Sequence, residues 1–358
     1  MTASSKRIEA VDVLRGITMA FMILVNNPGD WSHVYAPLQH ASWNGLTPTD
    51  CIFPVFLFLM GFSIYLSLGK SQFKLSGSLV KRILKRFILL FVIGFLLILP
   101  SGIMGGSVRI LGVLQRIALC YVAVAFLVCL VDGRWLPWIA AALLAVYTII
   151  LFAGNGFATD GTSILAKVDQ AILGSHIYNA NGLDPEGVLS TIPSIAHTLI
   201  GFLAARWCLE APGREEGSRR LLILGAILLI GGLLLNYGCP INKKVWSPTF
   251  ALATCGIGCL LLGVFMWAID EKHYWRHTGF WKVFGTNSIL CYILSFVLVY
   301  LFMFIPVGGK NISEWLFTFV SAIFGQGCLG SMMYAVALDL IIWAIVYPLY
   351  KRKIYLKL

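Results

Sequence analysis

The apolar residues of this chain fall into long runs that are separated by short polar connections. A helix that crosses the hydrocarbon core of a bilayer needs about 20 mostly apolar residues. By that rule the pattern predicts an all-α, polytopic transmembrane helix bundle of about ten spans. The expected spans cover residues 11–27, 51–69, 85–101, 109–131, 135–153, 188–206, 220–237, 249–269, 283–305 and 329–350. The apolar stretch from Ser313 to Gly325 is shorter and predicts an interfacial or re-entrant helix.

Composition agrees with this pattern. The chain is 59% hydrophobic and only 12% charged, whereas soluble domains carry about 25% charged residues. These values indicate an integral membrane protein surrounded by a lipid bilayer. The net charge of +11 would also suit a nucleic acid, but the basic residues lie between the apolar runs, where membrane topology explains them better. No nucleic-acid partner is therefore expected. No cleavable signal peptide is expected either, because the short polar start runs straight into a span with no small-residue cleavage site.

The distribution of Lys and Arg predicts the orientation. One set of connections contains Lys6, Arg7, Lys70, Lys74, Lys81, Arg82, Lys85, Arg86, Arg134, Arg206, Arg214, Arg219, Arg220, Lys272, Arg276, Lys282, Lys351, Arg352, Lys353 and Lys357. The opposite set contains Lys167, Lys243, Lys244 and Lys310, with Arg109 at a helix start. Because cytoplasmic loops carry the excess of positive charge, both termini are expected in the cytoplasm.

Cysteines and familiar motifs exclude several kinds of chemistry. The nine cysteines lie mostly within spans and form no CxxC pair, which indicates small buried apolar residues and neither disulfides nor metal ligands. The chain has no Walker P-loop, GxSxG, HExxH or Rossmann fingerprint in a βαβ context. His33 and His40 are seven apart, but the loop between them contains Pro37 and does not predict one helical face. No metal is expected.

The stretch from Ile23 to Met60 is the most distinctive part of the chain. A polar, aromatic loop carrying His40 lies between two apolar runs, so the imidazole is expected at a membrane face. An imidazole titrates near pH 6.5 and suits a general base at neutral pH. From the residues alone, this loop suits either a catalytic histidine or an ordinary polar connection.

Charges within apolar runs usually face a partner or a cavity. Asp12 and Arg15 are three apart, which predicts a structural ion pair, with substrate contact as the alternative. Arg109 and Arg116 are seven apart and share a helix face, with Gln115 adjacent. Arg116 lies about 10 Å into its span, a depth that calls for either an acidic partner or an anionic ligand, and we favour a functional role.

Two further polar clusters stand at expected helix starts. Thr47 or Thr49 could cap the second span, and Asp50 is expected to help cap and orient it. Asp184 and Glu186 precede the sixth span and could either interact with the helix dipole or bind an amino-sugar cation. His197, at the middle of its span, is expected to be a hydrogen-bonded packing residue.

Six segments, in order along the chain, resemble the heparan-alpha-glucosaminide N-acetyltransferase family. They are VDVLRG (Val11 to Gly16), VNNPG (Val25 to Gly29), QHASWNGLTPTDCIFPVFLFLMG (Gln39 to Gly61), RILGVLQRIALCY (Arg109 to Tyr121), DPEGVLSTIPSI (Asp184 to Ile195) and INKKVWSPTF (Ile241 to Phe250). HASWNGLTPTD and GVLQR are the specific signatures. The luminal amino-terminal domain of the animal enzyme has no counterpart in this sequence, so the polysaccharide substrate is not carried over.

The resemblance implies one transmembrane acyltransferase domain over residues 1–358, with a homodimer as a candidate assembly. It further implies transfer of an acetyl group from cytosolic acetyl-CoA, a co-substrate, to the amine of an extracytoplasmic, glucosamine-like acceptor. The expected location is the bacterial inner membrane. His40 matches the family histidine, and Asn26 matches an asparagine beside it that would stabilise the oxyanion.

The expected binding residues fall into two groups. Acetyl-CoA would be held by Lys81, Arg82, Lys85, Arg86, Arg109, Gln115, Arg116 and Asn287. The acceptor would be held by Asn44, Asp50, Asp184, Glu186 and Lys243. Two other classes of protein remain open: a membrane transporter for a sugar or anionic solute, and a non-catalytic membrane scaffold. Transporters often contain paired broken helices in two halves, and the sequence shows no such symmetry.

Overall fold

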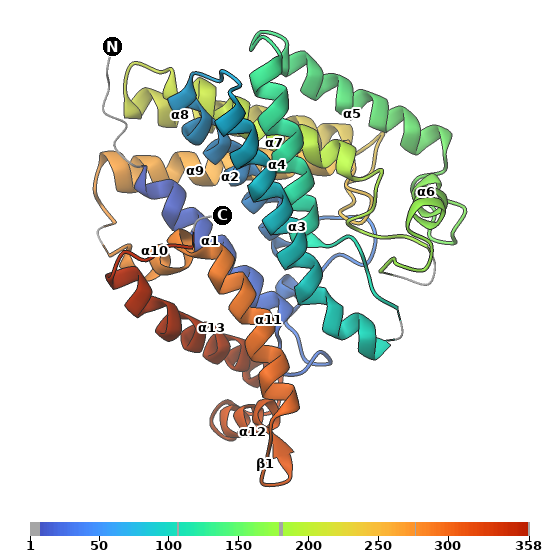
Figure 1. Ribbon diagram of the computed structural model, residues 1–358, viewed down its shortest axis with the longest axis vertical. Helices are drawn as coiled ribbons and strands as arrows, with labels where there is room; N and C mark the ends of the chain where they lie inside the picture. The colour runs from blue at the N-terminus through green and yellow to red at the C-terminus, as the bar shows by residue number, and fades with distance from the viewer. Residues whose placement is uncertain (1–7, 106, 179–181, 276, 357–358) are drawn as a thin grey trace. The chain divides into compact units, whose positions relative to one another are not determined.

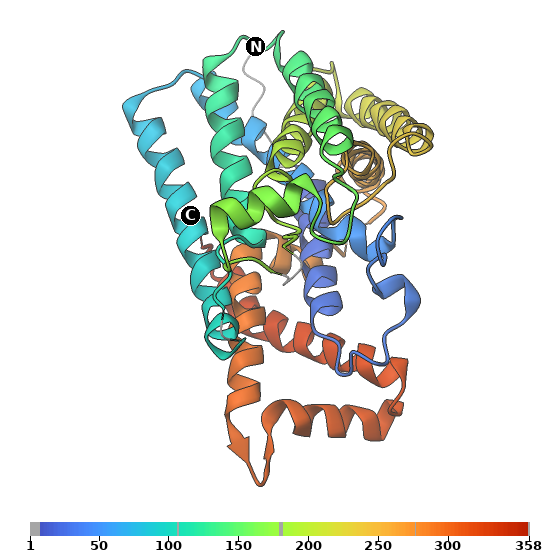
Figure 2. The same ribbon diagram turned by 90° about the vertical axis from the view of Figure 1, so that its right-hand side faces the viewer.

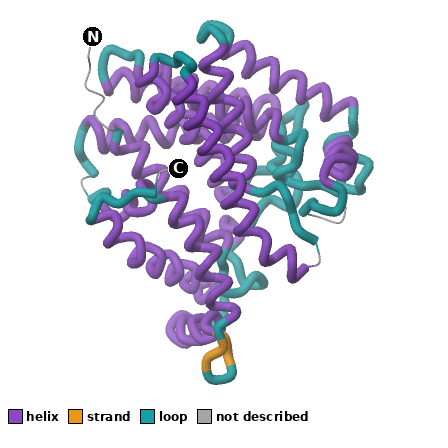
Figure 3. Tube along the Cα trace, viewed as in Figure 1, coloured by secondary structure: helices purple, strands orange, loops and turns teal. Residues whose placement is uncertain are grey.

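The computed structural model describes residues 8–105, 107–178, 182–275 and 277–356 (Figure 1). Four of the basic residues used to predict orientation, Lys6, Arg7, Arg276 and Lys357, lie outside this range. Within the described part, helices dominate, and the strands form one short hairpin (Figure 3). The predicted all-α class is confirmed.

The helices follow one another closely along the chain (Figures 1 and 2). The long ones are α1 (Glu9–Asn26), α2 (Pro48–Leu68), α3 (Gly77–Gly105), α4 (Val113–Leu130), α5 (Leu136–Ala153), α7 (Thr191–Leu209), α8 (Arg214–Leu235), α9 (Pro248–Phe265), α11 (Ser288–Phe304) and α13 (Cys328–Lys351). The shorter ones are α6 (Ile164–Leu173), α10 (Gly279–Thr286), α12 (Ile312–Phe324), the 3₁₀ turns η1 (Ala36–Leu38) and η2 (Gly69–Ser71), and the π-helical segment η3 (Met266–Glu271). The hairpin pairs β1 (Pro306–Val307) with β2 (Lys310–Asn311).

Eight of the described helices are long and apolar enough to cross a membrane, and the bent pair α10–α11 makes nine if it counts as one span. All ten expected segments are helical. The first, α1, is not among the eight apolar helices because three charged residues, Glu9, Asp12 and Arg15, lie in its first two turns. The ninth bends by 81° between α10 and α11. The short helix expected near Ser313 is α12.

The chain divides into two compact units. Unit 1 consists of residues 1–41, 47–56 and 265–357, and unit 2 consists of residues 42–46, 57–264 and 358. This division says nothing of how many domains act in the protein, and the single acyltransferase domain stays a prediction.

In unit 1, α1 packs against α10, α11 and α13. The buried carboxylate of Asp270 accepts the backbone N–H groups of Glu9 and Ala10 at 2.9 and 3.0 Å. It therefore caps the start of α1, where unsatisfied donors and the helix dipole favour a negative charge. Arg15 donates to Asp12 at 2.8 Å, which confirms the predicted ion pair.

In unit 2, α7 is the central helix and packs against α4, α5 and α8. In the most apolar 18-residue stretch of α7, 67% of the sequence is buried, compared with 17% in α3 and 22% in α8. These two helices therefore leave most of their apolar surface to the surrounding lipid.

Glycines allow two helix pairs to touch backbone to backbone. A Cβ on Gly61 of α2 would lie 2.0 Å from the carbonyl oxygen of Thr198 in α7, and one on Gly201 would lie 2.3 Å from the carbonyl oxygen of Phe58. In unit 1, Gly16 of α1 and Gly285 of α10 meet in the same reciprocal way. Small residues at such contacts are how helices associate closely in membranes.

We expect Gly61→Ala to destabilise the protein by about 1–3 kcal/mol, because the added methyl group overfills a contact between two backbones. The matched control is Gly231→Ala in α8, where a Cβ would meet no atom within 4 Å. The measurement is the midpoint of thermal unfolding in detergent. Equal midpoints for the two variants would contradict the close α2–α7 contact.

Candidate functional site

His40 lies in the connection between α1 and α2, and Asp50 holds its ring. Asp50 Oδ1 is 2.7 Å from His40 Nδ1. Since an ionised carboxylate only accepts hydrogen bonds, Nδ1 carries the proton and Nε2 of the neutral ring keeps its lone pair. The His40 side chain is 48% exposed, whereas that of Asp50 is 1% exposed. The arrangement is an imidazole base that is oriented by a buried carboxylate.

Local sequence fixes this carboxylate. The backbone N–H of Asp50 donates to the Thr47 hydroxyl at 3.3 Å, and Asp50 Oδ2 accepts the backbone N–H of Thr47 at 3.2 Å. This reciprocal capping pattern, with Pro48 at the first helical position, specifies a helix start. Oδ2 also accepts the N–H of Ala41 at 3.0 Å. The predicted capping and orienting role of Asp50 is confirmed, while its contact with an acceptor stays a prediction.

Asn26 is the last residue of α1 and is exposed. Its neighbour Asn27 donates its side-chain amide to the carbonyl oxygen of Ile23 at 2.7 Å and so closes the end of the helix. The predicted role of Asn26 at the oxyanion stays a prediction.

A second polar cluster lies in unit 2 and joins residues that were expected to hold different substrates. Arg109 Nε donates to Asp184 Oδ2 at 2.9 Å, and Arg109 Nη2 contacts both Asp184 and Glu186. Asp184 is fully buried and also accepts the backbone N–H groups of Tyr178 and Glu186. The acidic pair, for which the sequence left two roles open, has Arg109 as its partner.

The charges of this cluster shift the pKa values of its members. Burial raises the pKa of Glu186, but the positive charges of Arg109, Arg116 and Lys243 outweigh it, so that the net pKa is lowered. Burial likewise opposes the charge of Arg109, yet Glu186 and Asp184 raise its pKa above the ordinary value. Arg109 and Glu186 therefore favour their charged forms at neutral pH.

Arg116 of α4 is buried, with 1% of its surface exposed. It donates to Ser194 Oγ at 2.9 Å, to Ser190 Oγ at 2.5 Å and to the carbonyl oxygen of Gly187 at 3.0 Å. Its guanidinium carbon lies 5.2 Å from the centre of the Trp246 ring. Among the described residues, all its hydrogen-bond acceptors are neutral.

Two buried donor groups lie at this guanidinium, one of them its own Nε. Arg116 Nε and Gln115 Nε2 are buried and have no hydrogen-bond partner within the described part of the chain. Buried donors are almost always satisfied in folded proteins. Both belong to the GVLQR segment, and their predicted contact with acetyl-CoA stays a prediction.

The loop that carries this cluster is fastened by Asp169, which the sequence analysis did not single out. Asp169 Oδ1 accepts the backbone N–H of Val188 at 2.8 Å, and Oδ2 accepts that of Asp184 at 3.4 Å. Asp169 belongs to α6, in a stretch expected to be a long loop. Ser163 at the N-cap and Gly174 after the last turn are helix-boundary signals that could have located α6.

Other predicted acceptor residues meet at one loop of unit 2. The Asn242 amide donates to Asn44 Oδ1 at 3.0 Å, and Lys244 Nζ donates to the carbonyl oxygen of Ser42 at 2.8 Å. Lys243 lies close enough to Glu186 to lower its pKa. Asn44 is thus occupied by a structural contact, while Lys243 adds positive charge to the Arg109 cluster.

The predicted CoA cations of α3 differ in their surroundings. Lys81, Arg82 and Lys85 are exposed. Arg86 lies over the Tyr121 ring at 4.5 Å. Asn287, placed with them by resemblance, is buried at the α10–α11 bend and bonds with the backbone of Ile354 and Leu356 at 3.2 and 3.0 Å.

His197 and Asp339 are both buried within spans. The His197 ring lies 5.7 Å from that of Trp246, edge to face, which agrees with the predicted packing role. Asp339 Oδ1 has no hydrogen-bond partner within the described residues.

Comparison with known families decides the ancestry of the chain. Residues 7–236 match the family model described as "Heparan-alpha-glucosaminide N-acetyltransferase, catalytic". The chain belongs to this family. The matched region contains His40, Asp50, Arg109, Arg116 and the acidic pair, whereas Lys243 and Asn287 lie beyond it.

Two relatives carry the name heparan-alpha-glucosaminide N-acetyltransferase. The human protein is 30% identical over 362 residues and the mouse protein 29% over 358 residues. The alignments cover 82% and 81% of this chain. The chain spans about half the length of these relatives, 53% of each. A shorter match, 24% over 164 residues, joins it to an alpha-(1->3)-arabinofuranosyltransferase of Corynebacterium glutamicum and covers 40% of this chain and 37% of that protein.

For this member of the heparan-alpha-glucosaminide N-acetyltransferase family, we expect Arg109→Gln to destabilise unit 2 by about 3–5 kcal/mol, because it leaves the buried Asp184 carboxylate uncompensated. Adding Asp184→Asn should recover part of the loss. The control Arg219→Gln removes a side chain that is 69% exposed in its ion pair and should change stability by less than about 1 kcal/mol. Thermal unfolding measures all three, and no recovery in the double variant would contradict the pairing.

The buried carboxyl group of Asp169 should make the stability of the protein depend on pH. Burial raises its pKa from 3.8 to about 6. A carboxyl whose folded-state pKa is raised contributes stability below its unfolded pKa, and this contribution is lost as the pH rises through about 6. From pH 5 to pH 8 the wild type should therefore lose about 1 kcal/mol that Asp169→Asn does not lose.

The control for this pH effect is Asp160→Asn, in the same connection, where hydrogen bonds from Thr162 lower the carboxyl pKa. Asp160 stays ionised throughout this pH window, so its variant should keep the wild-type slope. Identical slopes for wild type and Asp169→Asn would rule out titration of Asp169.

Proposed function

We propose that this protein is a membrane-bound N-acetyltransferase that uses acetyl-CoA and an amino-sugar acceptor. The pairing of His40 with the buried Asp50, inside the segment that matches the family model, carries the proposal. Eight apolar helices long enough to cross a bilayer support its location in a membrane. The bacterial inner membrane, with both termini cytoplasmic, remains our proposal for the compartment.

The reaction needs a base and little covalent help from the protein. A thioester is already activated, so the protein must position both substrates and remove a proton from the attacking amine. Asp50 holds the Nδ1 proton of His40, and Nε2 takes the proton of the amine as its nitrogen attacks the thioester carbonyl. The carbon–sulfur bond then breaks, and the imidazolium returns the proton to the CoA sulfur. The products are an N-acetylated sugar and free CoA.

The cationic groups have separate tasks in this proposal. Lys81, Arg82 and Lys85 are exposed at the start of α3, and cations of this kind bind phosphate groups. The unpartnered donors of Gln115 and Arg116 would serve carbonyl or phosphate oxygens of acetyl-CoA deeper in unit 2. Asn26 would donate its amide to the oxyanion, and Asp184, Glu186 and Lys243 would set the charge around the acceptor.

The test is thioester consumption by the purified full chain with acetyl-CoA and glucosamine. We expect transfer that falls by about 10²- to 10⁴-fold in His40→Ala, because the general base is lost. Asp50→Asn should lower kcat by as much as about 10⁴-fold, since it favours the wrong tautomer, with little change in the KM for acetyl-CoA.

The chain offers matched controls in the same connection. His33 Nδ1 lies 2.7 Å from Asp30 Oδ2, and both side chains are more exposed than Asp50, at 52% and 33%. His33→Ala and Asp30→Asn should therefore keep wild-type transfer. Absence of any acetyl transfer by the folded wild type to amines would refute the proposal and favour a transporter or a scaffold.

The order of the chemical steps gives a second test. Direct transfer predicts no release of CoA when acetyl-CoA is supplied without an acceptor. A relay through acetylated His40 predicts a stoichiometric burst of free thiol and an acetyl-protein adduct. We expect no burst in a stopped-flow thiol assay, and an acetyl group trapped on His40 would overturn the direct route.

A further inference from the structure

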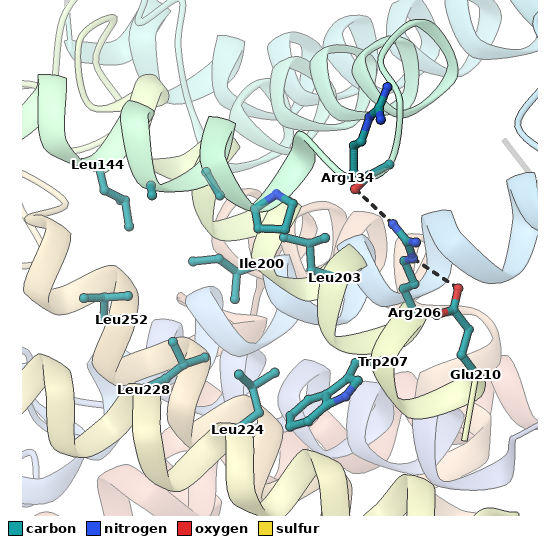
Figure 4. A pocket seen from close by; sticks show the side chains of 14 residues that line it. Arg134, Leu144, Ile200, Leu203, Arg206, Trp207, Glu210, Leu224, Leu228 and Leu252 are labelled. Carbon is teal, nitrogen blue, oxygen red and sulfur yellow. Dashed lines mark hydrogen bonds and ion pairs between the residues drawn. The ribbon is translucent and has the colours of Figure 1, made fainter. Parts of the chain in front are cut away.

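Several cations of unit 2 pair with carboxylates, whereas the ammonium group of Lys244 is directed at the main chain. At one end of the apolar cavity between α5, α7 and α8, Arg206 pairs with Glu210 at 3.1 Å (Figure 4). Arg134 at the same end pairs with Asp132 at 3.2 Å. The charges of these two arginines are therefore balanced locally. A cation that donates to the backbone instead can hold a segment of the chain in place.

Lys244 lies in the loop between α8 and α9 and holds the segment that follows His40. Its Nζ donates to the carbonyl oxygen of Ser42 at 2.8 Å and lies 5.6 Å from the centre of the Trp43 ring. A hydrogen bond from a charged donor is stronger than one between neutral groups, and a cation over an indole ring adds a further attraction. Both contacts fall within three residues of the proposed base.

The same loop holds this segment at two more positions. The backbone N–H of Gly45 donates to the carbonyl oxygen of Ile241 at 2.8 Å, and the Asn242 amide donates to Asn44 Oδ1 at 3.0 Å. Gly45 has a φ of 126°, a conformation that glycine adopts without steric cost. The segment from Ser42 to Gly45 is thus bound to the loop at both of its ends.

The loop can hold the segment because it is itself fixed within unit 2. Asn242 is buried, and its Oδ1 accepts the backbone N–H of Val245 at 3.1 Å. The carbonyl oxygen of Val245 accepts the Tyr147 hydroxyl of α5 at 2.5 Å. Trp246 is also buried, and its ring centre lies 5.2 Å from the guanidinium carbon of Arg116. Lys244 therefore projects from a backbone that is anchored on its other side.

Restraint of the segment reaches His40 along the chain. Only Ala41 stands between His40 and Ser42, and its backbone N–H donates to Asp50 Oδ2 at 3.0 Å. Two consecutive main-chain contacts, from Asp50 and then from Lys244, therefore follow the imidazole. Because a misplacement of about 1 Å can cost about 10²-fold in rate, loosening the second contact should slow a reaction at His40 Nε2.

We propose that Lys244 is a positioning residue for the acetyl transfer: it fixes the main chain directly after His40 and thereby the direction of the imidazole. The inference rests on the proposed function, in which His40 is the base. Residue 244 lies beyond the region 7–236 that matches the family model, so the match does not assign this role. Lys244 acts through Ser42 and Trp43 and needs no contact with either substrate.

The experiment combines kinetics with hydrogen exchange on the full chain in detergent. We expect Lys244→Gln to lower kcat for transfer from acetyl-CoA to glucosamine by about tenfold or more, with the KM for acetyl-CoA changed by less than about twofold. Lys244→Arg should restore most of kcat, because a guanidinium can donate to the same carbonyl oxygen and stack on Trp43. Mass spectrometry of the peptide covering residues 41–46 should show faster amide exchange in Lys244→Gln and near wild-type exchange in Lys244→Arg.

Lys310 offers a matched control. Its Nζ donates to Thr318 Oγ1 at 3.4 Å and lies 5.4 Å from the centre of the Trp315 ring. It thus makes the same two kinds of contact, a hydrogen bond and a tryptophan ring, in the region of α12. Lys310→Gln should keep the wild-type kcat and the wild-type exchange of residues 41–46. The midpoint of thermal unfolding should be similar in all three variants, so that a fall in kcat reports position and not loss of the fold.

The two measurements separate failure of this inference from failure of the proposed function. Faster exchange in Lys244→Gln with an unchanged kcat would overturn the positioning role, and unchanged exchange would overturn the contact itself. A raised KM with an unchanged kcat would place Lys244 at a substrate instead, and an equal loss in Lys310→Gln would remove the specificity. If the wild type transfers no acetyl group while exchange responds as expected, the proposed function fails and the positioning role falls with it, but the contact stands.

Discussion

The structure depends on how it compensates charge that has been taken out of water. Arg109 neutralises Asp184 and Glu186 in one cluster, and the loop that carries this cluster also supplies the Gly187 carbonyl and the Ser190 hydroxyl to Arg116. A buried charge is tolerated only when it is paired or well hydrogen-bonded. Within the described residues Arg116 is hydrogen-bonded by neutral groups, and its positive charge also acts on the nearby carboxylate of Glu186. Asp169 of α6 accepts two backbone N–H groups of the same loop and so links these contacts to α6.

The candidate base His40 is oriented by a carboxylate that also has a structural role. In unit 1, the Asp50 carboxylate closes the first turn of α2 and at the same time fixes the tautomer of His40. One buried side chain therefore ties the geometry of a helix start to the direction of a proton acceptor. The nearby His33–Asp30 pair has the same two residue types without the buried helix start. Comparison of the two pairs shows that the position of the carboxylate in a capped helix, and not the pairing alone, distinguishes the candidate base.

The sequence predicts the helices and the main polar residues well because both follow simple rules. Long apolar runs give spans, and the Asp12–Arg15 and Thr47–Asp50 spacings give contacts within one turn of a helix. Contacts between distant segments are different. Arg109 and Asp184 are 75 residues apart, and no local pattern joins them, so the cation and its acidic partners were assigned to separate substrates. The Asn287 amide bonds with the backbone of Ile354 and Leu356, a contact between distant segments that no local pattern predicts, while its predicted role at a ligand stays a prediction. The bend of 81° beside it is likewise a tertiary feature.

The division of the chain into units has a consequence for synthesis. Most of unit 2 is one uninterrupted stretch, residues 57–264, whereas unit 1 joins α1 to helices made more than 250 residues later. Chains emerge from the ribosome amino-terminal end first, and contiguous regions can fold as they appear. Unit 2 can therefore assemble during translation, while α1 must wait in the membrane for α10 and α13. During that interval its Gly16 surface and the helix start later capped by Asp270 have no native neighbour. A membrane chaperone or insertase would have its longest opportunity to act on α1.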